Sequence, residues 1–165
     1  MKYSIRNIDL ESDKDFILES HCKINFKCES KWTAECGYDR YRSKWFSTDN
    51  PSKFLKALTK SLKESRALGL IVQDGVKKIG YCWVSFYDIK DYDISIAEIN
   101  DILIIDSYKN KGIASFLIKH VEEQCKTNGA KVLRSGTGIN NLASIKLHEK
   151  LDFQTYRVEF EKVLL

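Results

Sequence analysis

The chain has 165 residues, of which 43% are hydrophobic and 30% charged, with five cysteines and a formal net charge of +4. This length and composition are typical of one globular domain, so we expect a single domain over 1–165. The charge suits an anionic ligand but is too small for a nucleic-acid-binding surface. No apolar run has membrane-spanning length and the first residues form no signal-peptide core, so we expect a cytoplasmic protein without membrane contact. The cysteines form no C-x-x-C pair, which predicts reduced thiols and no metal site.

The first part of the chain predicts a strand followed by two helices. Residues 3–8 alternate as in a strand, and Ser12 with Asp15 resembles the N-terminal cap of a helix. Residues 27–47 form an aromatic-rich segment that we expect to be irregular. Pro51 then opens a helix whose apolar residues lie on one face.

A hairpin and a long strand follow. The segments 68–73 and 78–87 have the character of strands and are joined at Asp74-Gly75, a strong turn signal. Residues 88–93 form an acidic loop. The β-branched run over 94–105 predicts a further strand.

The loop 109–114, Lys-Asn-Lys-Gly-Ile-Ala, is the most informative segment. It lies between that strand and an amphipathic helix that ends near Asn128-Gly129, a helix-stop signal. A strand that enters a helix through a tight basic loop gathers unpaired N–H groups at the positive end of a helix dipole. Gly112 lets an anion approach the backbone, and two lysines add charge. The loop therefore predicts a site for a phosphate-bearing ligand.

Two motifs indicate which phosphate-bearing ligand the loop binds. Neither the three-glycine dinucleotide motif nor the nucleotide-hydrolysing P-loop is present. The pattern [Q/R]-x-x-G-x-[G/A] fits, with Lys109 in place of Gln or Arg, and it resembles the pyrophosphate-binding motif of the GNAT N-acetyltransferase superfamily. The segment 141–153, which follows a short strand over 131–135, is similar to that family's late signature N-x-A-x-x-x-L-Y-x-x-x-G-F. The resemblance is specific over about residues 78–155.

The resemblance implies an α/β (α+β) GNAT fold. Its sheet is mixed and mostly antiparallel, has six to seven strands with a V-shaped splay between the fourth and fifth, and is flanked by helices. The alternating tail 155–164 is expected to complete this sheet. The implied activity is transfer of an acetyl group from acetyl-CoA, the cofactor, to a primary amine.

Two positions depart from the family pattern. Asp152 stands where the family usually has glycine, and we expect the turn to survive because Asp tolerates a left-handed backbone. His148 stands where the family has a tyrosine that protonates the departing thiolate. Imidazolium is a stronger acid than a thiol, so His148 is a candidate acid, or only a contact to the cofactor. His21 and His120 have no motif support and are interpreted as ordinary side chains.

The acceptor amine must lose a proton, which makes carboxylates before the loop candidate bases. Glu98 lies eleven residues ahead of Lys109, a spacing at which some family members place a general base. Its alternative role is an ion pair at a strand end. Asp101 is the second candidate, although strand alternation puts it on the opposite face unless the strand has a bulge.

The cofactor contacts are expected from the loop, the strand before it and the last helix. Backbone groups of the strand should bind the pantetheine arm as an added strand does. Asn141 is placed by the resemblance to bond the same arm, and it also suits a helix cap. The full expected set is Ile102, Leu103, Ile104, Lys109, Asn110, Lys111, Gly112, Ile113, Ala114, Ser115, Asn141, Ser144 and His148.

The acceptor is the least determined part of the prediction. Residues expected to bind it are Trp32, Glu35, Tyr38 and Glu98, because carboxylates beside aromatic faces suit a cationic amine. The acceptor is a small polyamine or aminoglycoside-like molecule, or a peptide amine. The rival function is a CoA-binding sensor or interaction module without turnover, favoured by His148 and opposed by Glu98. A homodimer is possible, since family members commonly pair through sheet edges or C-terminal strands.

Overall fold

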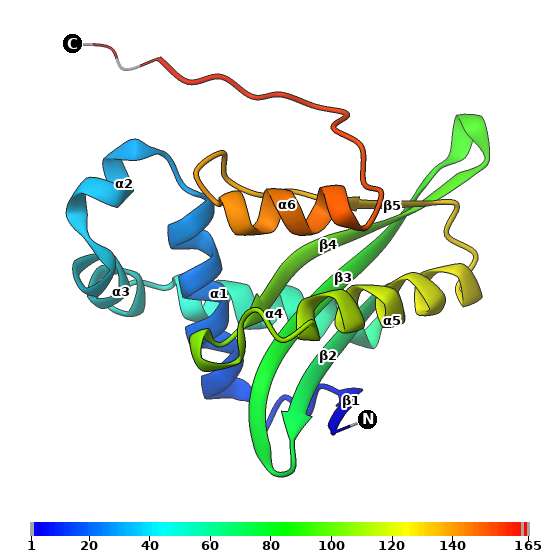
Figure 1. Ribbon diagram of the computed structural model, residues 1–165, viewed down its shortest axis with the longest axis horizontal. Helices are drawn as coiled ribbons and strands as arrows, with labels where there is room; N and C mark the ends of the chain where they lie inside the picture. Colours follow the sequence, from blue (N-terminus) through cyan, green and yellow to red (C-terminus); the bar gives the residue numbers. More distant parts are fainter. Residues whose placement is uncertain (1, 163, 165) are drawn as a thin grey trace.

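A mixed five-stranded sheet, in the order β1-β2-β3-β4-β5, forms the centre of the protein (Figure 1). The computed structural model describes residues 2–162 and 164, except for the side chains of residues 31, 32 and 34. The first four strands are antiparallel neighbours and β5 runs parallel to β4. The expected GNAT-like sheet is confirmed, with five strands where six to seven were expected. The strands are β1 Tyr3–Asn7, β2 Ala67–Asp74, β3 Lys77–Ile89, β4 Ile94–Ile104 and β5 Val132–Ser135.

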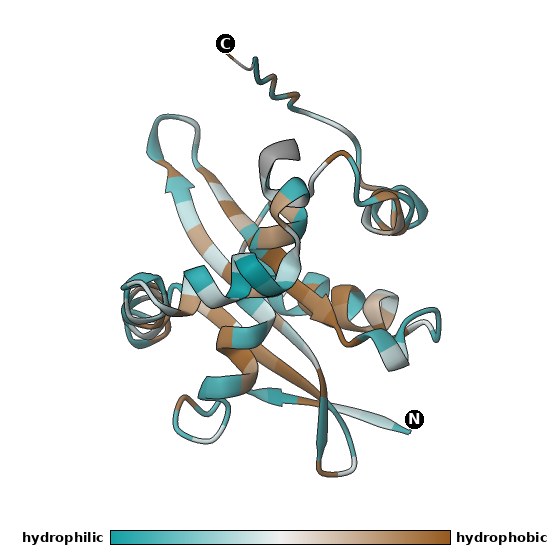
Figure 2. Ribbon diagram, turned by 90° about the vertical axis from the view of Figure 1, so that its left-hand side faces the viewer, coloured by the Kyte–Doolittle hydropathy of each residue, from teal (hydrophilic) through white to brown (hydrophobic). Residues whose placement is uncertain are grey.

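Helices cover both faces of the sheet. On one face, α1, α3 and α4 enclose a cluster that includes Ile17, Phe54 and Tyr81. On the other face, α5 packs Leu117 and Val121 against the strands. Figure 2 shows the hydrophobic positions gathered on the central strands and on the helix faces beside them. The helices are α1 Lys14–Cys28, α2 Lys31–Cys36, α3 Tyr38–Phe46, α4 Asn50–Lys63, α5 Ile113–Thr127 and α6 Leu142–Lys150, with short 3-10 turns η1 Lys90–Tyr92 and η2 Asp106–Tyr108.

The prediction that 27–47 is irregular is wrong. Two helices, α2 and α3, occupy most of it because its aromatic residues recur at helical spacing. Tyr38, Tyr41 and Trp45 are three and four residues apart, and Tyr38 and Tyr41 both pack against Phe26 of α1 with ring centroids 5.3 and 5.4 Å away.

The expected cap at Ser12 is also absent, because α1 begins at Lys14 and the Ser12 hydroxyl donates to Asp9 instead. The residue between them, Asp13, is fully buried. Its carboxylate accepts hydrogen bonds from Arg6 of β1, and Lys78 of β3 pairs with it at 2.8 Å. Asp13 therefore joins the start of α1 to two strands.

The V-shaped splay lies between β4 and β5. Their ladder runs from Ile96 opposite Val132 to Ile99 opposite Ser135 and ends there. Beyond it, β4 continues to Ile104 with backbone pairing to β3. The last part of β4 therefore presents a free edge where the two strands separate.

The tail does not complete the sheet as predicted. Residues 153–162 form no strand, and Tyr156, Val158 and Phe160 are exposed. Alternation is compatible with a strand but does not by itself make the segment pair with the sheet, and no strand of the sheet pairs with the described part of the tail. Beyond Phe153 the tail runs away from the sheet (Figure 1), and Arg134 lies over the Tyr156 ring at 4.7 Å. Asp152 ahead of it has the expected left-handed backbone, with φ of 61°.

Candidate active site

The loop between β4 and α5 presents unpaired backbone N–H groups. Asn110 and Gly112 have left-handed backbones, with φ of 59° and 76°, and no side chain caps the start of α5. Ile113, Ala114 and Ser115 form the first helical turn, in which N–H groups have no partner within the helix. A Cβ at Gly112 would meet nothing within 4 Å, so the space above the loop is open. The loop thus has the geometry of an anion site.

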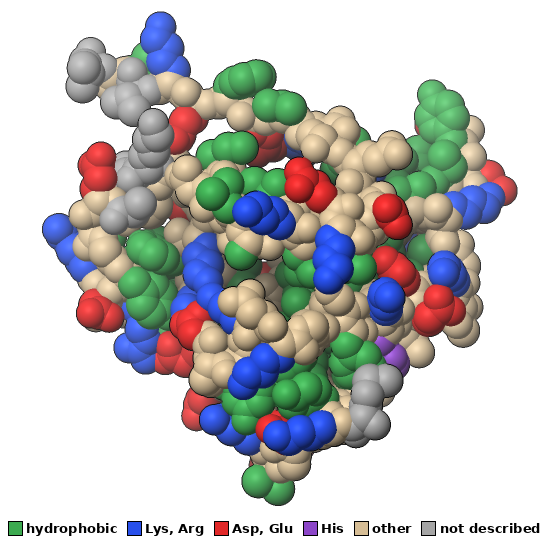
Figure 3. Space-filling view, viewed as in Figure 1, with side chains coloured by type: hydrophobic (Ala, Val, Ile, Leu, Met, Phe, Trp, Pro, Cys, Tyr) green, Lys and Arg blue, Asp and Glu red, His purple; other side chains and the backbone are tan. Residues whose placement is uncertain are grey.

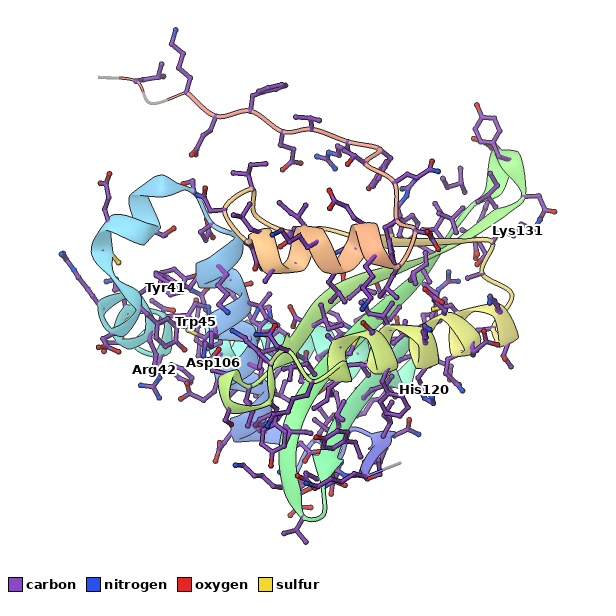
Figure 4. All side chains as sticks on the ribbon, in the orientation of Figure 1. Tyr41, Arg42, Trp45, Asp106, His120 and Lys131 are labelled. Carbon is purple, nitrogen blue, oxygen red and sulfur yellow. The ribbon has the colours of Figure 1, made fainter. Side chains whose placement is uncertain are left out.

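Lysines from two elements gather beside this loop. Lys109 and Lys23 of α1 both pair with Asp106, which Figure 4 places next to α1. Hydrogen bonds from these two lysines hold the pKa of the Asp106 carboxyl well below its usual range. Lys111 donates to the Ser107 carbonyl at 3.0 Å. The expected positive charge is therefore present, and part of it comes from α1.

The free edge of β4 contains the backbone groups expected to bind the pantetheine arm. Ile102, Leu103 and Ile104 pair with β3 on one side, and the β5 ladder has already ended on the other. Figure 3 shows a hollow at the centre of this face of the molecule, with Lys and Arg side chains around it. An added strand has hydrogen-bond partners at such an edge.

A bulge in β4 brings the two candidate bases to the same face of the sheet. The register between β3 and β4 shifts by one residue, which leaves Asn100 as the extra residue. Ala97 and Ile99 point into the cluster under α5, so Glu98 between them points to the α1 side. Asp101 also points there, because it bonds to a residue of α1. In a regular strand without the bulge, Glu98 and Asp101 would point to opposite faces of the sheet.

The two carboxylates differ in their surroundings. Asp101 is 2% exposed, and its Oδ2 lies 2.8 Å from His21 Nδ1 and accepts a hydrogen bond of 3.0 Å from the Tyr81 hydroxyl. Asn25 lies 3.0 Å from the other ring nitrogen of His21. Burial, and then Asp101, raise the pKa of Tyr81 well above its usual value. Glu98 is half-buried, and within the described residues nothing hydrogen-bonds to its carboxylate, so Glu98 is the freer base.

His148 lies at the mouth of the splay. Its Nδ1 is 2.7 Å from the Ser144 carbonyl, which can only accept, so Nδ1 bears a proton. Its Nε2 is 2.8 Å from Ser135 Oγ. Ser135 forms the last rung of the β4–β5 ladder. The imidazole therefore connects α6 to the point where the strands separate.

The other expected residue at the start of α6, Asn141, occupies the N-cap position of the helix. Asn141 immediately precedes α6, but its side chain donates to Thr137 Oγ1 at 3.1 Å and makes no cap hydrogen bond. The N-cap position is therefore confirmed, without the side-chain hydrogen bond of a cap, and a contact to the cofactor stays a prediction.

Of the expected acceptor-binding residues, Glu98 lies on β4, and Trp32, Glu35 and Tyr38 belong to α2 and α3. Glu35 is exposed, whereas Tyr38 packs into the α1–α3–α4 cluster. The Trp32 side chain lies outside the described residues. Their roles stay predictions.

Two functional candidates carry no motif signal. His21 is interpreted as an ordinary side chain from the sequence, yet it lies four residues after buried Ile17 and four before Asn25, on one helix face. Ser135 ends a predicted strand, and nothing in the sequence indicates its contact with His148.

Among the residues with described positions, no group of three or more His, Cys, Asp or Glu is placed to hold a metal ion. The helices of the described part include none that is long and apolar enough to cross a membrane.

Comparisons with known proteins identify the family of this chain. The sequence model of the acetyltransferase (GNAT) family matches residues 30–153. An uncharacterized N-acetyltransferase of Methanocaldococcus jannaschii is 24% identical over 157 residues, covering 94% of this chain and 62% of that protein. The chain thus spans less than two thirds of that relative's length.

Solved structures share the fold at low identity. A transcriptional regulator from Bacillus halodurans C-125 has a TM-score of 0.72 and 16% identity, with 98% of this chain and 99% of that chain covered. The aminoglycoside N-acetyltransferase AAC(6')-Iy, solved in complex with CoA, has a TM-score of 0.67 and 19% identity, with 98% and 94% covered. These solved structures have the same fold as this chain. The chain belongs to the GNAT family of acetyltransferases.

Acetyl-CoA is the acetyl donor of this family, and the residues present fit it. The open space over Gly112 and the uncapped start of α5 suit a diphosphate. The unpaired edge from Ile102 to Ile104 suits the amide groups of the pantetheine arm.

Proposed function

We propose that this protein is an N-acetyltransferase that moves an acetyl group from acetyl-CoA to a primary amine of a small molecule or peptide. The observation that supports the proposal most is the bulge at Asn100. It directs Glu98 and Asp101 to one face of β4, beside the end of the β4–β5 ladder. A base and an anion-binding loop then flank the free edge expected to hold the thioester.

Glu98 removes the acceptor's proton in this proposal. Bound acetyl-CoA supplies an activated acyl group whose carbon is attacked by the amine nitrogen. An ammonium has no lone pair, so a proton must first pass to a base. The Glu98 carboxylate is free to accept it, whereas Asp101 Oδ2 already accepts from two partners. Asp101 instead contributes negative charge, which favours binding of a cationic acceptor amine.

His148 protonates the sulfur that leaves. As an imidazolium it donates through Nε2, which faces Ser135 at the mouth of the splay. Imidazolium is a stronger acid than a thiol, so transfer to a thiolate is downhill. The Ser135 hydroxyl is able to carry this proton between them.

The acceptor is a small cationic amine. Two carboxylates share the α1-side face with Trp45, Phe54 and Trp83. Such a combination attracts a cation by charge and by aromatic faces. The similar structure of an aminoglycoside N-acetyltransferase supports a small molecule over a peptide.

The second candidate function is a CoA-binding sensor without turnover. The similar structure described as a transcriptional regulator favours it, as does a histidine at the family's tyrosine position. The free Glu98 carboxylate favours the enzyme, because a sensor has no need of a base at this place.

Thiol release from acetyl-CoA with a panel of amines tests the proposal. The panel contains kanamycin A, spermidine and a lysine-containing peptide, each with a no-amine control. Release that depends on one of these amines, with an acetylated product seen by mass spectrometry, supports the enzyme. CoA binding without release for any amine supports the sensor.

A further inference from the structure

A serine and a histidine meet at the point where β4 and β5 separate. Ser135 Oγ of β5 lies 2.8 Å from Nε2 of His148 on α6. Nδ1 of the same ring lies 2.7 Å from the Ser144 carbonyl, which cannot donate, so the neutral imidazole bears its proton on Nδ1. Nε2 then has the lone pair, and the Ser135 hydroxyl donates to it. The contact therefore has the polarity of a serine nucleophile beside its general base.

Two further contacts hold the imidazole in this orientation. The Ser144 carbonyl fixes the ring through Nδ1, as the third group does where a nucleophile, a base and an orienting group act together. The Phe153 ring lies edge-on to the imidazole, with ring centroids 5.0 Å apart and planes at 79°. Ser135 and His148 are both half-buried, so a ligand in the splay is able to reach them. The base is thus oriented before any ligand binds.

The space around the Ser135 hydroxyl suits an acyl group. Ser135 pairs with Ile99 in the last rung of the β4–β5 ladder, and beyond it the edge of β4 is unpaired. A Cβ at Gly136 would meet nothing within 4 Å, so the space beside the serine is open. Alternate N–H groups of β4 point away from β3 along the unpaired edge, where they are able to donate to an oxyanion. A thioester bound along this edge lies beside a nucleophile and hydrogen-bond donors.

We propose that Ser135 and His148 give the protein a second activity, the amine-independent hydrolysis of acetyl-CoA through an acetyl-serine. This inference rests on the proposed function, because it needs acetyl-CoA bound with its thioester at the end of the β4–β5 ladder. His148 Nε2 takes the hydroxyl proton while Ser135 Oγ forms a bond to the acetyl carbon. The carbon–sulfur bond breaks, and the leaving thiolate takes that proton from Nε2, so CoA leaves as the thiol.

Water completes the cycle when no amine is bound. His148 is neutral again after CoA leaves, so Nε2 accepts a proton from a water molecule whose oxygen attacks the acetyl carbon of the ester. The bond between this carbon and Ser135 Oγ breaks, Oγ takes the proton from Nε2, and acetic acid leaves. One acetyl-CoA and one water give one CoA and one acetic acid, and no further reactant is needed.

The full chain, incubated without amine with acetyl-CoA that is isotopically labelled in its acetyl group, tests this activity. Labelled acetate is quantified, and peptides of the acid-quenched protein are searched by mass spectrometry for an acetyl group on Ser135. The ester accumulates if its hydrolysis is slower than its formation, and acetate accumulates if hydrolysis is faster. One of the two signals is therefore expected. The absence of both, in a protein that binds acetyl-CoA, overturns the proposal.

Ser135→Ala should lower the amine-independent signals by about 10²-fold or more, because the nucleophile is gone. The affinity of this variant for CoA, measured by calorimetry, should stay close to that of the parent, which shows that the fold and the cofactor site are intact. The control Ser52→Ala removes a hydroxyl from an exposed position in the first turn of α4 and should match the parent. Parent-like acetate formation by Ser135→Ala would mean that water attacks the thioester directly and overturns the proposal.

The reaction with an accepted amine separates this inference from the proposed function. There the amine attacks the thioester itself, so Ser135→Ala should still acetylate the amine although it no longer hydrolyses acetyl-CoA. A parent that acetylates an amine but shows neither acetyl-Ser135 nor acetate rejects the acetyl-serine alone. A parent that binds no CoA rejects the cofactor site on which both depend. The two failures are therefore distinguishable.

Discussion

At the residue scale, the two carboxylates on the α1 side of β4 differ in the contacts that they already make. Asp101 accepts from His21 and Tyr81 and is buried, whereas the Glu98 carboxylate is half-buried and free within the described residues. Removing Asp101 would leave buried polar partners unsatisfied and disturb the fold. Glu98 is therefore the residue at which chemistry can be tested with the fold intact.

Glu98→Gln should lower kcat/KM for an accepted amine by about 10²–10⁴-fold, the usual effect of a general base. The amide keeps the shape of the side chain but cannot accept the proton. Affinity for CoA, measured by calorimetry, should stay within twofold of the parent. Glu11→Gln, at an exposed position before α1, is the control and should match the parent in rate. A parent-like rate in Glu98→Gln would remove Glu98 from the mechanism.

His148→Phe should reduce kcat more than it reduces CoA affinity. Phe fills the space beside Phe153, whose ring centroid lies 5.0 Å from that of His148, but it donates no proton. Ser135→Ala breaks the contact to Nε2 while keeping the imidazole, and its loss of kcat should be smaller. Steady-state rates and CoA titrations of both variants measure this. A loss of affinity with kcat unchanged would reduce His148 to a cofactor contact.

At the element scale, the strand–loop–helix unit of β4 and α5 was predictable because its signals are local. A β-branched run, a glycine and an amphipathic helix with a glycine stop are each visible in the sequence. The bulge depends on how β4 pairs with β3, so the sequence alone leaves open which face Asp101 takes. The contacts of His21 and Ser135 depend on tertiary packing in the same way.

Two other elements show where local patterns mislead. Over 27–47, aromatic density suggests irregular structure, although the spacing of Tyr38, Tyr41 and Trp45 already fits a helix. The tail alternates as a strand does, but alternation alone does not show whether a segment pairs with an edge of the sheet. Composition alone is a poor guide to either segment.

Gly112→Asp should weaken binding of CoA to the phosphate loop while leaving the fold intact. Asp tolerates a left-handed backbone better than most residues, and a carboxylate at a helix N-terminus is favourable, so the free energy of unfolding should fall by at most about 1 kcal/mol. The same carboxylate repels a diphosphate and occupies the open space above the loop. Affinity for CoA should fall by about 10²-fold or more.

Gly75→Asp is the matched control for this variant. Gly75 also has a left-handed backbone, with φ of 58°, and a Cβ there also meets nothing within 4 Å, but it lies in the β2–β3 turn. Calorimetry with CoA should therefore give a parent-like affinity for Gly75→Asp. A parent-like affinity of Gly112→Asp would show that the diphosphate does not lie on this loop.

At the scale of the whole molecule, the sheet separates two hydrophobic clusters; β4 packs into one of them, and its Asp101 accepts a hydrogen bond from Tyr81 of the other. The α5 cluster supports the phosphate loop, and the α1–α3–α4 cluster supports the face with the carboxylates. Both must keep their positions relative to β4 for the site to persist. The ion cluster at Asp13 serves this purpose, because it ties the start of α1 to β1 and β3.

The Asp13 cluster predicts how stability depends on pH. Burial opposes ionisation of Asp13, but hydrogen bonds from Arg6 and Lys78 outweigh it and hold the pKa of Asp13 well below its usual value. Since the pKa is lower in the folded chain than in the unfolded one, this contribution is complete above about pH 5 and is lost progressively at lower pH. Asp13→Asn should lower the free energy of unfolding at pH 7 by about 2–3 kcal/mol, because two charged partners lose their anion.

Urea unfolding of the parent and of Asp13→Asn at pH 7, 5, 4 and 3 measures this dependence. The difference between the two proteins should be largest at pH 7 and shrink as the pH falls, because Asp13 of the unfolded parent takes up a proton that the folded parent does not, which favours the unfolded chain. Asp91→Asn, at an exposed position in η1, should follow the parent at every pH. A difference that stays constant down to pH 3 would mean that Asp13 stabilises the fold through packing rather than through its charge.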